Sequence, residues 1–298
     1  MSLIVFIPLI ILLRAGISIL PVDVIGFLLT CNSRPRLGCS SGFYLRGMFY
    51  RMLRSYDPYM ATQIHEYKGL APFSISPLIE VYPGAYFFRV TSYLTKLSDA
   101  VLKAFSRAQD LKLADHTYHL IEISYKRIDL DDLVKDSKPL RRYEVEFITP
   151  TCFRRPSPYI PLHALGLLAK IMRAMGRPKS HYRFHPLPDP TLMLRNLKRQ
   201  WDQYAGVSLM GKRFNRWLEE GGIAIAGVSQ IKTHRLMDKA RKRFFVGFTG
   251  RVRFSLPEDT FSEENAKVVN VLLRIGQETQ VGVNRTAGFG VYKILKAK

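Results

Sequence analysis

The order of the predicted secondary-structure elements constrains the fold more than any other feature of this sequence. Helices are predicted where apolar residues recur every three or four positions, and strands where apolar and polar residues alternate. In the first half, the expected elements are a strand within 9–20, helices over 42–55 and 57–67, strands over 73–82 and 86–94, a helix over 95–109 and a strand over 117–127. Together they form a β-α-β-β-α-β order.

The same order returns in the second half, after the charged stretch 136–142, which is the best linker in the chain. The expected elements there are a strand over 143–148, helices over 162–175 and 191–204, strands over 223–234 and 244–256, a helix over 262–275 and a strand over 289–295. A chain of 298 residues is long enough for two separate cores. We therefore expect an α+β protein of two tandem ferredoxin-like (RRM-like) domains with antiparallel sheets, residues 1–140 and 141–298.

The N-terminal residues Met1 to Leu13 carry no charge, so a strand must be distinguished from a signal peptide and a membrane span. A secretory signal has basic residues before its apolar run, whereas the first basic residue here, Arg14, follows it. The run is also shorter than the roughly 20 residues of a spanning helix. Because this end of the chain is rich in Ile and Val, we interpret the part within about 9–20 as a buried strand and expect no membrane partner.

The charge of the chain indicates a polyanionic partner. Lys and Arg number 45 against 24 Asp and Glu, which gives a formal net charge of +21. This excess is larger than solubility requires. By charge alone, the partner is nucleic acid or an acidic membrane surface.

Motifs for disulfides, metals and cofactors are incomplete. The three cysteines, Cys31, Cys39 and Cys152, are widely spaced and odd in number, which excludes a disulfide framework and a four-cysteine zinc site. Residues 206–212 fit G-x-x-x-x-G-K, but Arg213 replaces the Ser or Thr that would hold magnesium. We therefore expect no cofactor and no bound metal, in a protein of the reducing cytoplasm.

A strongly basic hairpin is predicted over the strands near 223–256. Eight basic residues stand against the single acid Asp238 within 22 positions: Lys232, Arg235, Lys239, Arg241, Lys242, Arg243, Arg251 and Arg253. A charge run is most often a solvated face, but this imbalance favours phosphate binding. Removing one such residue should weaken binding without changing sequence preference.

A glycine-rich loop over residues 282–290 precedes the last predicted strand. Glycines such as Gly288 and Gly290 let the backbone approach a ligand closely, and Arg285 adds positive charge. By itself the loop supports two interpretations equally: a phosphate-binding loop and an ordinary turn into a strand.

Acid–base chemistry is suggested by one face of the first predicted helix. Arg46, Tyr50 and Arg54 are four positions apart, so they align on one face beside the apolar stripe. Two guanidinium groups favour a phenolate and would lower the pKa of Tyr50, which would make it usable as a base. The alternative is a boundary tyrosine between surface arginines.

His65 falls in the last turn of the short second helix, off the apolar face formed by Met60, Ile64 and Tyr67. A helix C-terminus stabilises the imidazolium, so the ring would be ready to donate a proton. The interpretation as a general acid competes with an exposed histidine that has no chemical role.

Several segments together resemble one known family. Gly288-Phe289-Gly290, preceded by residues 246–252, is similar to the C-terminal signature of the CRISPR-associated endoribonuclease family Cas six, a RAMP family that processes precursor CRISPR RNA. Residues 47–50, 57–58, 64–68 and 73–78 are similar to the family's first helix, its histidine-bearing segment and the strand that follows, and residues 147–151 to the opening of its second domain. The resemblance covers most of the chain from about residue 10 onward.

The resemblance implies two ferredoxin-like domains and a metal-independent cut within CRISPR repeats. A ribose 2′-OH attacks the adjacent phosphate, leaving a 2′,3′-cyclic phosphate and a 5′-OH. By the same resemblance Tyr50 would be the general base and His65 the general acid. Ungapped alignment puts Ala71 where the family has a lysine that stabilises the phosphorane, so Lys68 or one of Arg46 and Arg54 would take that role.

The partner implied is CRISPR repeat RNA, held by Arg46, Arg54, the basic hairpin and the glycine-rich loop. The competing hypothesis is a non-catalytic RAMP subunit that binds processed guide RNA within a CRISPR interference complex. The sequence leaves open whether other Cas proteins or a second copy of the chain also bind.

Overall fold

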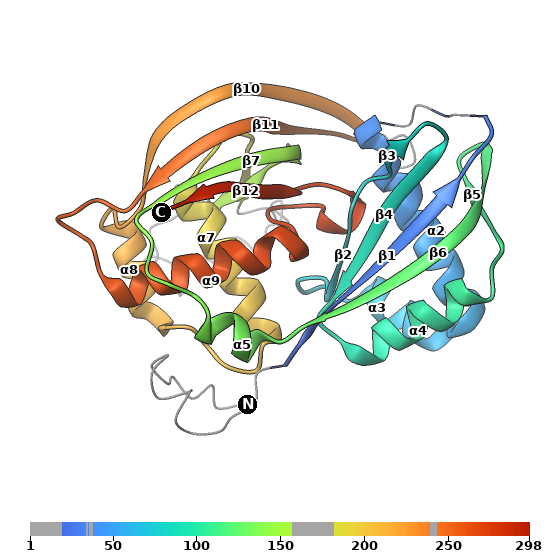
Figure 1. Ribbon diagram of the computed structural model, residues 1–298, viewed down its shortest axis with the longest axis horizontal. Helices are drawn as coiled ribbons and strands as arrows, with labels where there is room; N and C mark the ends of the chain where they lie inside the picture. The colour runs from blue at the N-terminus through green and yellow to red at the C-terminus, as the bar shows by residue number, and fades with distance from the viewer. Residues whose placement is uncertain (1–19, 34, 36–37, 157–181, 239–242) are drawn as a thin grey trace, which may run out of the picture.

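The computed structural model describes residues 20–33, 35, 38–156, 182–238 and 243–298. These residues form two large antiparallel sheets that lie side by side, each with helices packed on one face (Figure 1). The strand predicted within 9–20 and the helix predicted over 162–175 lie outside the described residues.

The N-terminal sheet has the strand order β2-β4-β1-β6-β5, and β3 also pairs with β4. Its strands are β1 (Val22–Thr30), β2 (Phe73–Ile75), β3 (Ile79–Tyr82), β4 (Ala85–Ser92), β5 (Asp110–Leu113) and β6 (His116–Ile128). One face is covered by α2 (Ser41–Tyr56), α3 (Pro58–Glu66) and α4 (Thr95–Ser106), and the short turn η1 (Gly38–Ser40) precedes α2. Aromatic side chains, including Phe27, Phe49 and Phe88, fill the core between sheet and helices.

The C-terminal sheet has the order β10-β11-β7-β12, and a separate ribbon pairs β8 with β9. The strands are β7 (Arg142–Thr151), β8 (Phe153–Pro156), β9 (Tyr182–His185), β10 (Ala224–Asp238), β11 (Arg243–Ser255) and β12 (Tyr292–Ala297). The helices are α7 (Pro190–Tyr204), α8 (Gly211–Glu219) and α9 (Glu263–Thr279), with the short turn η3 (Arg285–Ala287) after α9. The connecting helix α5 (Leu130–Lys135) already packs into this second core, although it precedes the boundary predicted after residue 140.

The α+β class with antiparallel sheets is confirmed. Some strand boundaries differ from the predicted ones because of individual proline and glycine residues. The segment predicted as one strand over 73–82 is two strands, because Pro77 between them has no N–H for the ladder. The last strand begins at Tyr292, because Gly288 and Gly290 adopt positive φ angles of +84° and +77°. Neither β1, which carries the polar Asp23, nor the short β5 was predicted.

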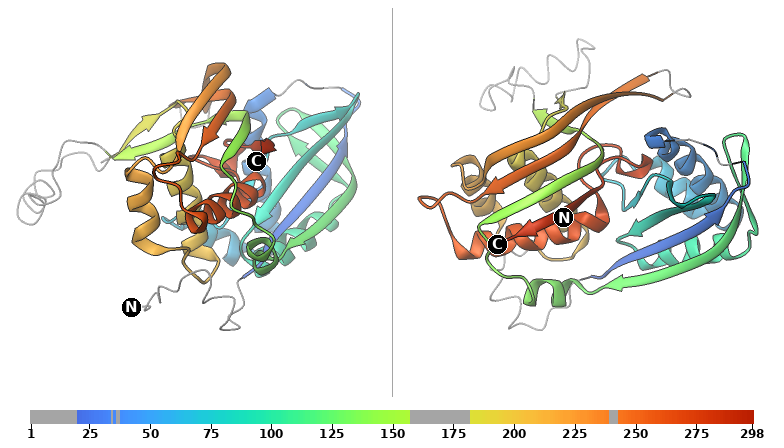
Figure 2. Two further views of the ribbon diagram at one scale, coloured as in Figure 1. Left: turned by 60° about the vertical axis from the view of Figure 1, so that its left-hand side comes forward. Right: turned by 45° about the horizontal axis from the view of Figure 1, so that its top comes forward.

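The two halves pack together through the segment between α9 and β12. The turn η3 lies against α2 and β2, as the views in Figure 2 also show. Phe289 packs between Phe43 of α2 and Phe245 of β11, with ring centroids 5.3 and 4.6 Å away. Arg89 of β4 forms an ion pair with Glu278 of α9 at 2.6 Å. Buried contacts therefore join the halves in addition to the connecting chain.

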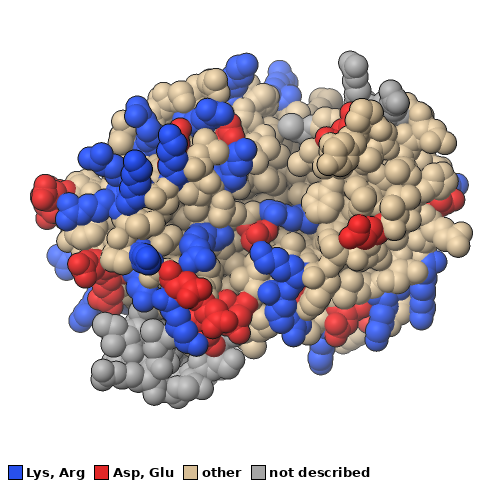
Figure 3. Space-filling view, viewed as in Figure 1, with Lys and Arg blue, Asp and Glu red and all other residues tan. Residues whose placement is uncertain are grey.

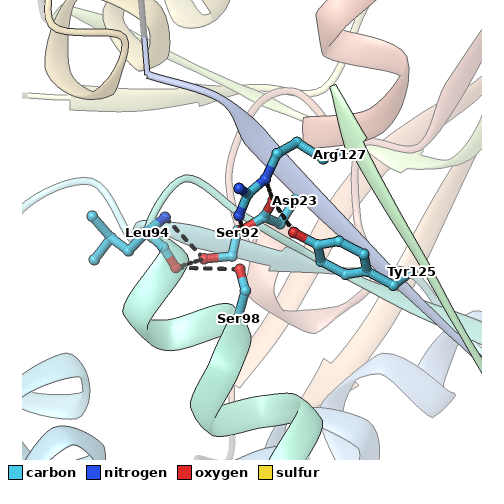
Figure 4. Close-up of polar contacts among 6 residues, drawn as sticks. All are labelled: Asp23, Ser92, Leu94, Ser98, Tyr125 and Arg127. Atoms are coloured by element: carbon cyan, nitrogen blue, oxygen red, sulfur yellow. Dashed lines mark hydrogen bonds and ion pairs between the residues drawn. The ribbon is translucent and has the colours of Figure 1, made fainter. Parts of the chain in front are cut away.

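Asp23 forms a buried polar centre where β1, β6 and α4 meet (Figure 4). Its Oδ1 accepts hydrogen bonds from Tyr125 Oη at 2.7 Å and Arg127 Nε at 2.8 Å. Burial opposes ionisation of the carboxyl, but hydrogen bonds from Arg127, Tyr125 and Ser98 outweigh it and hold the pKa of Asp23 below its ordinary value. The ionised carboxylate therefore stabilises the folded state.

We expect Asp23→Asn to lower the free energy of unfolding by about 2 kcal/mol at pH 7, because a neutral amide accepts weaker bonds from Arg127. The folded pKa lies below the unfolded value of about 4, so this stabilisation is complete above pH 4 and is lost as the pH falls through the folded pKa. Urea unfolding at several pH values should show the variant losing less stability below pH 4 than the original chain. The matched control is Asp99→Asn, an exposed position on α4.

Candidate active site

A one-residue corner joins the helices that carry the predicted base and acid. Asp57 ends α2, where its N–H donates to the Leu53 carbonyl at 2.7 Å, and it caps α3, where Oδ1 accepts the Met60 N–H at 2.9 Å. Pro58 fits the first position of α3, where no N–H is needed. The corner folds α3 back against α2, and the last turn of α3 reaches the middle of α2.

Tyr50 and His65 are in contact in this arrangement. Their ring centroids are 5.1 Å apart and the ring planes meet at 83°. Tyr50 is half-buried, and its ring also packs edge-on against Phe49 and Phe73, at centroid distances of 5.5 and 6.1 Å. His65 is exposed to solvent. The two residues predicted as base and acid are therefore brought together at one surface site.

Cationic side chains flank this pair along the chain. Arg46 lies on α2 one turn before Tyr50, with its Cζ 5.6 Å from the Phe43 ring centroid. Arg54 is exposed one turn after Tyr50, and Lys68 is exposed just beyond the end of α3. Each of these residues is close in sequence to the pair, and each offers a positive charge for a phosphate.

The segment that follows His65 is held by side chains of the C-terminal half, a feature the sequence did not reveal. Tyr204 of α7 donates to the Leu70 carbonyl, and Gln280 Nε2 donates to the Ile75 carbonyl at 3.1 Å. On the same segment Gln203 Nε2 donates to Tyr67 Oη at 2.6 Å. The position of the loop after α3 therefore depends on the second half of the chain.

Arg285, which the sequence predicted as a phosphate ligand, belongs to this interface. The side chain is 4% exposed, and its two terminal nitrogens donate to the Thr279 and Ala71 carbonyls, each at 2.9 Å. Burial lowers the pKa of its guanidinium. Arg285 thus ties the loop before β12 to the loop after α3.

The glycines of the same loop are buried as well. Gly290 donates its N–H to the Pro150 carbonyl at 3.3 Å, and a Cβ at this position would lie 1.8 Å from the Val281 carbonyl oxygen. A Cβ at Gly288 would lie 3.2 Å from the Gly42 Cα. Both glycines permit protein segments to approach one another closely.

The predicted basic hairpin is formed by β10 and β11, and Figure 3 shows Lys and Arg side chains gathered over this sheet. Lys232 and Arg235 are exposed on β10, and the Arg235 Cζ lies 4.1 Å from the Phe244 ring centroid. Arg243 begins β11, whereas Arg241 and Lys242 lie outside the described residues. The exposed residues of β10 remain candidates for phosphate contact.

Acids from a neighbouring strand reduce the positive charge of this hairpin. Glu146 of β7 accepts from Arg251 Nε at 2.8 Å and pairs with Lys293 at 3.2 Å. The hydrogen bond from Arg251 lowers the pKa of Glu146. Glu144 lies opposite Arg253 in the sheet register. Arg251, predicted as an RNA ligand, is therefore already ion-paired, which a count of charges along the hairpin could not detect.

Within the part of the chain that the structure describes, no group of three His, Cys, Asp or Glu side chains could hold a metal ion. Across those same residues, every helix is too short or too polar to cross a membrane.

Solved structures with the same architecture define the class of protein, a RAMP fold of two tandem ferredoxin-like domains, as predicted. Thermus thermophilus Cas6 is 23% identical over 94% of this chain and 100% of its own, with a TM-score of 0.68. The same protein in a product complex is 22% identical over 92% of this chain and 100% of that one, with a TM-score of 0.72. The product of a Cas6-related gene from Pyrococcus furiosus is 14% identical over 92% of this chain and 99% of its own, with a TM-score of 0.56.

A match to a family model narrows this class. The model of the CRISPR-associated endoribonuclease Cas6 matches residues 145–292. The chain belongs to this family, which confirms the resemblance inferred from its motifs. No curated protein matches the sequence of the chain.

Proposed function

We propose that the protein is an endoribonuclease that cuts precursor CRISPR RNA within its repeats, without a metal ion. The observation that carries the proposal is the contact between Tyr50 and His65 in a Cas6-family chain. Solved relatives of the same fold are described as complexes with a product and with a substrate mimic. A base and an acid that share one site suit a reaction in which one proton leaves a nucleophile and another reaches a leaving group.

In this reaction the ribose 2′-oxygen attacks the adjacent phosphorus and the bond from phosphorus to the 5′-oxygen breaks. Tyr50 takes the proton of the 2′-OH, and His65 gives a proton to the departing 5′-oxygen. The products are a 2′,3′-cyclic phosphate and a 5′-OH. Lys68, Arg46 or Arg54 stabilises the negative charge that develops on the phosphate oxygens, a contribution of about 10² to 10³ in rate.

The test is cleavage of a CRISPR repeat RNA in EDTA, resolved on a denaturing gel. We expect one cut per repeat and a 5′-OH on the downstream fragment. A repeat with a single 2′-deoxy substitution at the cut should stay intact, because it lacks the attacking hydroxyl. Cutting of the deoxy substrate, or cutting that begins only when magnesium is added, would contradict the proposal.

One observation favours the binding-only alternative. Ala71 occupies the position that the family's lysine would take in an ungapped alignment, and its carbonyl accepts a hydrogen bond from Arg285. A guide-RNA-binding subunit needs no such lysine. That alternative predicts tight binding of the repeat with no cleavage at any protein concentration, so the same gel and a binding assay distinguish the two functions.

The exposed residues of the basic hairpin should contribute salt-dependent binding. We expect Lys232→Gln to weaken repeat binding and to reduce the slope of log affinity against log salt by about 0.7, the value for one phosphate contact on a single strand. Filter binding between 50 and 300 mM salt measures both quantities. Lys103→Gln, an exposed position on α4, removes the same charge and should change neither. Equal effects of the two substitutions would exclude a contact at Lys232.

A further inference from the structure

A pocket of about 360 Å³ lies between the two halves, beside the loop that follows His65 and Lys68. Its walls come from residues 69–71, the start of β8, one side of α7 and the loop over 282–286. The volume is at the lower end of the range for small-molecule sites, so the pocket suits a group the size of one nucleotide.

The polar part of the pocket is cationic. Arg154 and Arg199 are exposed at its walls, and Arg195 pairs with Glu219, whose own side chain is 64% exposed. Arg285 also lines the pocket, and its Nη2 donates to Ala71, another lining residue. Among the described residues, no carboxylate forms an ion pair with Arg285.

A buried guanidinium without a carboxylate is costly, because its charge has left water without an opposite charge nearby. The carbonyls of Thr279 and Ala71 satisfy two donors but do not neutralise the charge. An anion in the pocket would offset this cost and would meet Arg195 and Arg199 at the same time. The arginines therefore indicate an anionic ligand.

Part of the remaining wall is apolar, and part is hydrogen-bonded within the protein. Leu70, Leu192 and Val283 are half-buried, so each presents some apolar surface. The Asn196 Oδ1 accepts from the Gly282 N–H at 2.8 Å, which fixes the floor formed by the loop. A flat apolar group could pack on these side chains while an attached anion meets the arginines.

We propose that this pocket takes one unpaired nucleotide of the RNA, with its phosphate at Arg195 and Arg199 and its base against Leu192 and Val283. The proposal rests on the proposed function for the identity of the RNA. The nucleotide must be unpaired, because a base within a helix is stacked on both faces and cannot enter. The pocket shares residues 69–71 with the loop after Lys68, so the proposal places the bound nucleotide on the side of the molecule that carries this loop.

The experiment measures affinity for a repeat RNA with a 2′-deoxy substitution at the cut, so that binding is separated from cleavage. We expect Arg199→Gln to weaken binding about tenfold, the loss of one charged hydrogen bond. Leu192→Trp should fill the pocket and weaken binding by roughly tenfold or more, the value of a stacked base. Arg213→Gln, an exposed position on the neighbouring helix α8, is the matched control and should bind like the original chain.

A scan of abasic substitutions along the repeat identifies the nucleotide. One abasic position should weaken binding to the original protein and have no further effect on Leu192→Trp, because both changes remove the same contact. If every abasic substitution weakens RNA binding by Leu192→Trp as much as it weakens binding by the original protein, the proposal is overturned. A second result would also overturn the proposal: Leu192→Trp binds RNA with normal affinity but no longer binds 5′-AMP, which the original chain binds. That result would assign the pocket to a free nucleotide. If folding of Leu192→Trp is impaired in a thermal melt, Arg199→Glu at the exposed wall replaces it.

The outcome is independent of catalysis. If the unmodified repeat is not cut but the pocket variants bind weakly, the pocket stands and the proposed reaction fails. If the repeat is cut and Arg199→Gln, Arg199→Glu and Leu192→Trp all bind normally, the reaction stands and the pocket proposal fails.

Discussion

His65→Ala is expected to slow cleavage of the repeat RNA by about 10² to 10⁴ while leaving RNA affinity within about twofold. The reason is that a general acid acts on the leaving oxygen in the transition state, whereas binding depends on the cationic side chains elsewhere. His65 is exposed and contacts Tyr50 through its ring, so its removal creates no buried cavity. Single-turnover rates with enzyme in excess, and affinity for the 2′-deoxy substrate, measure the two quantities separately.

A substrate with sulfur in place of the bridging 5′-oxygen tests the role of His65 directly. A thiolate leaves without protonation, so His65→Ala should cut this RNA nearly as fast as the original chain does. Tyr50→Phe keeps the ring contacts with Phe49 and Phe73 but removes the hydroxyl, and sulfur should not rescue it if Tyr50 is the base. His119→Ala, at an exposed histidine paired with Asp110 on the edge of the sheet, is the matched control.

Wild-type rates for His65→Ala on the normal substrate would remove His65 from the mechanism. Failure of sulfur to rescue a slow His65→Ala variant would instead show that the histidine acts by positioning the RNA. The two results lead to different roles for the same side chain.

Much of the fold could be predicted because its helices carry strong local signals. Asp189 caps α7 by accepting the Leu192 N–H at 2.9 Å, and Ser262 caps α9 by accepting from Asn265. Such signals depend on residues three positions apart. β1 escaped prediction because Asp23 interrupts its apolar pattern, and distant residues, among them Arg127 and Tyr125, make that carboxylate favourable inside the protein.

The residues of the candidate site divide in the same way, into those that local sequence signals identify and those whose partners are distant in the sequence. Tyr50 and His65 lie on two helices joined by Asp57, so short-range chemistry and the family resemblance were enough to pair them. Arg285 and its acceptor Ala71 are 214 positions apart, and Arg251 and Glu146 are 105 apart. No local pattern shows that such charges will be buried or paired, because their partners are set by how the sheets and loops pack.

The contact between the two halves at α2 provides the second large expected effect. We expect Gly42→Ala to lower the free energy of unfolding by about 1 to 3 kcal/mol, the usual cost of overpacking. A Cβ at this position would lie 1.9 Å from the Ala287 carbonyl oxygen and 2.8 Å from the Gly288 Cα, so backbone must move on one side or the other. Because α2 also carries Tyr50, the cleavage rate should fall with the stability.

Gly47→Ala on the same helix is the control that separates packing from helix propensity. Nothing lies within 4 Å of a Cβ at this exposed position, so alanine should raise the free energy of unfolding by roughly 1 kcal/mol. Urea unfolding measures both variants. If Gly42→Ala lowers the free energy of unfolding and Gly47→Ala raises it, the strain lies where α2 contacts η3. If both variants gain stability, α2 and η3 are not in close contact in solution. The second half of the chain would then not be coupled through this contact to the helix that carries Tyr50.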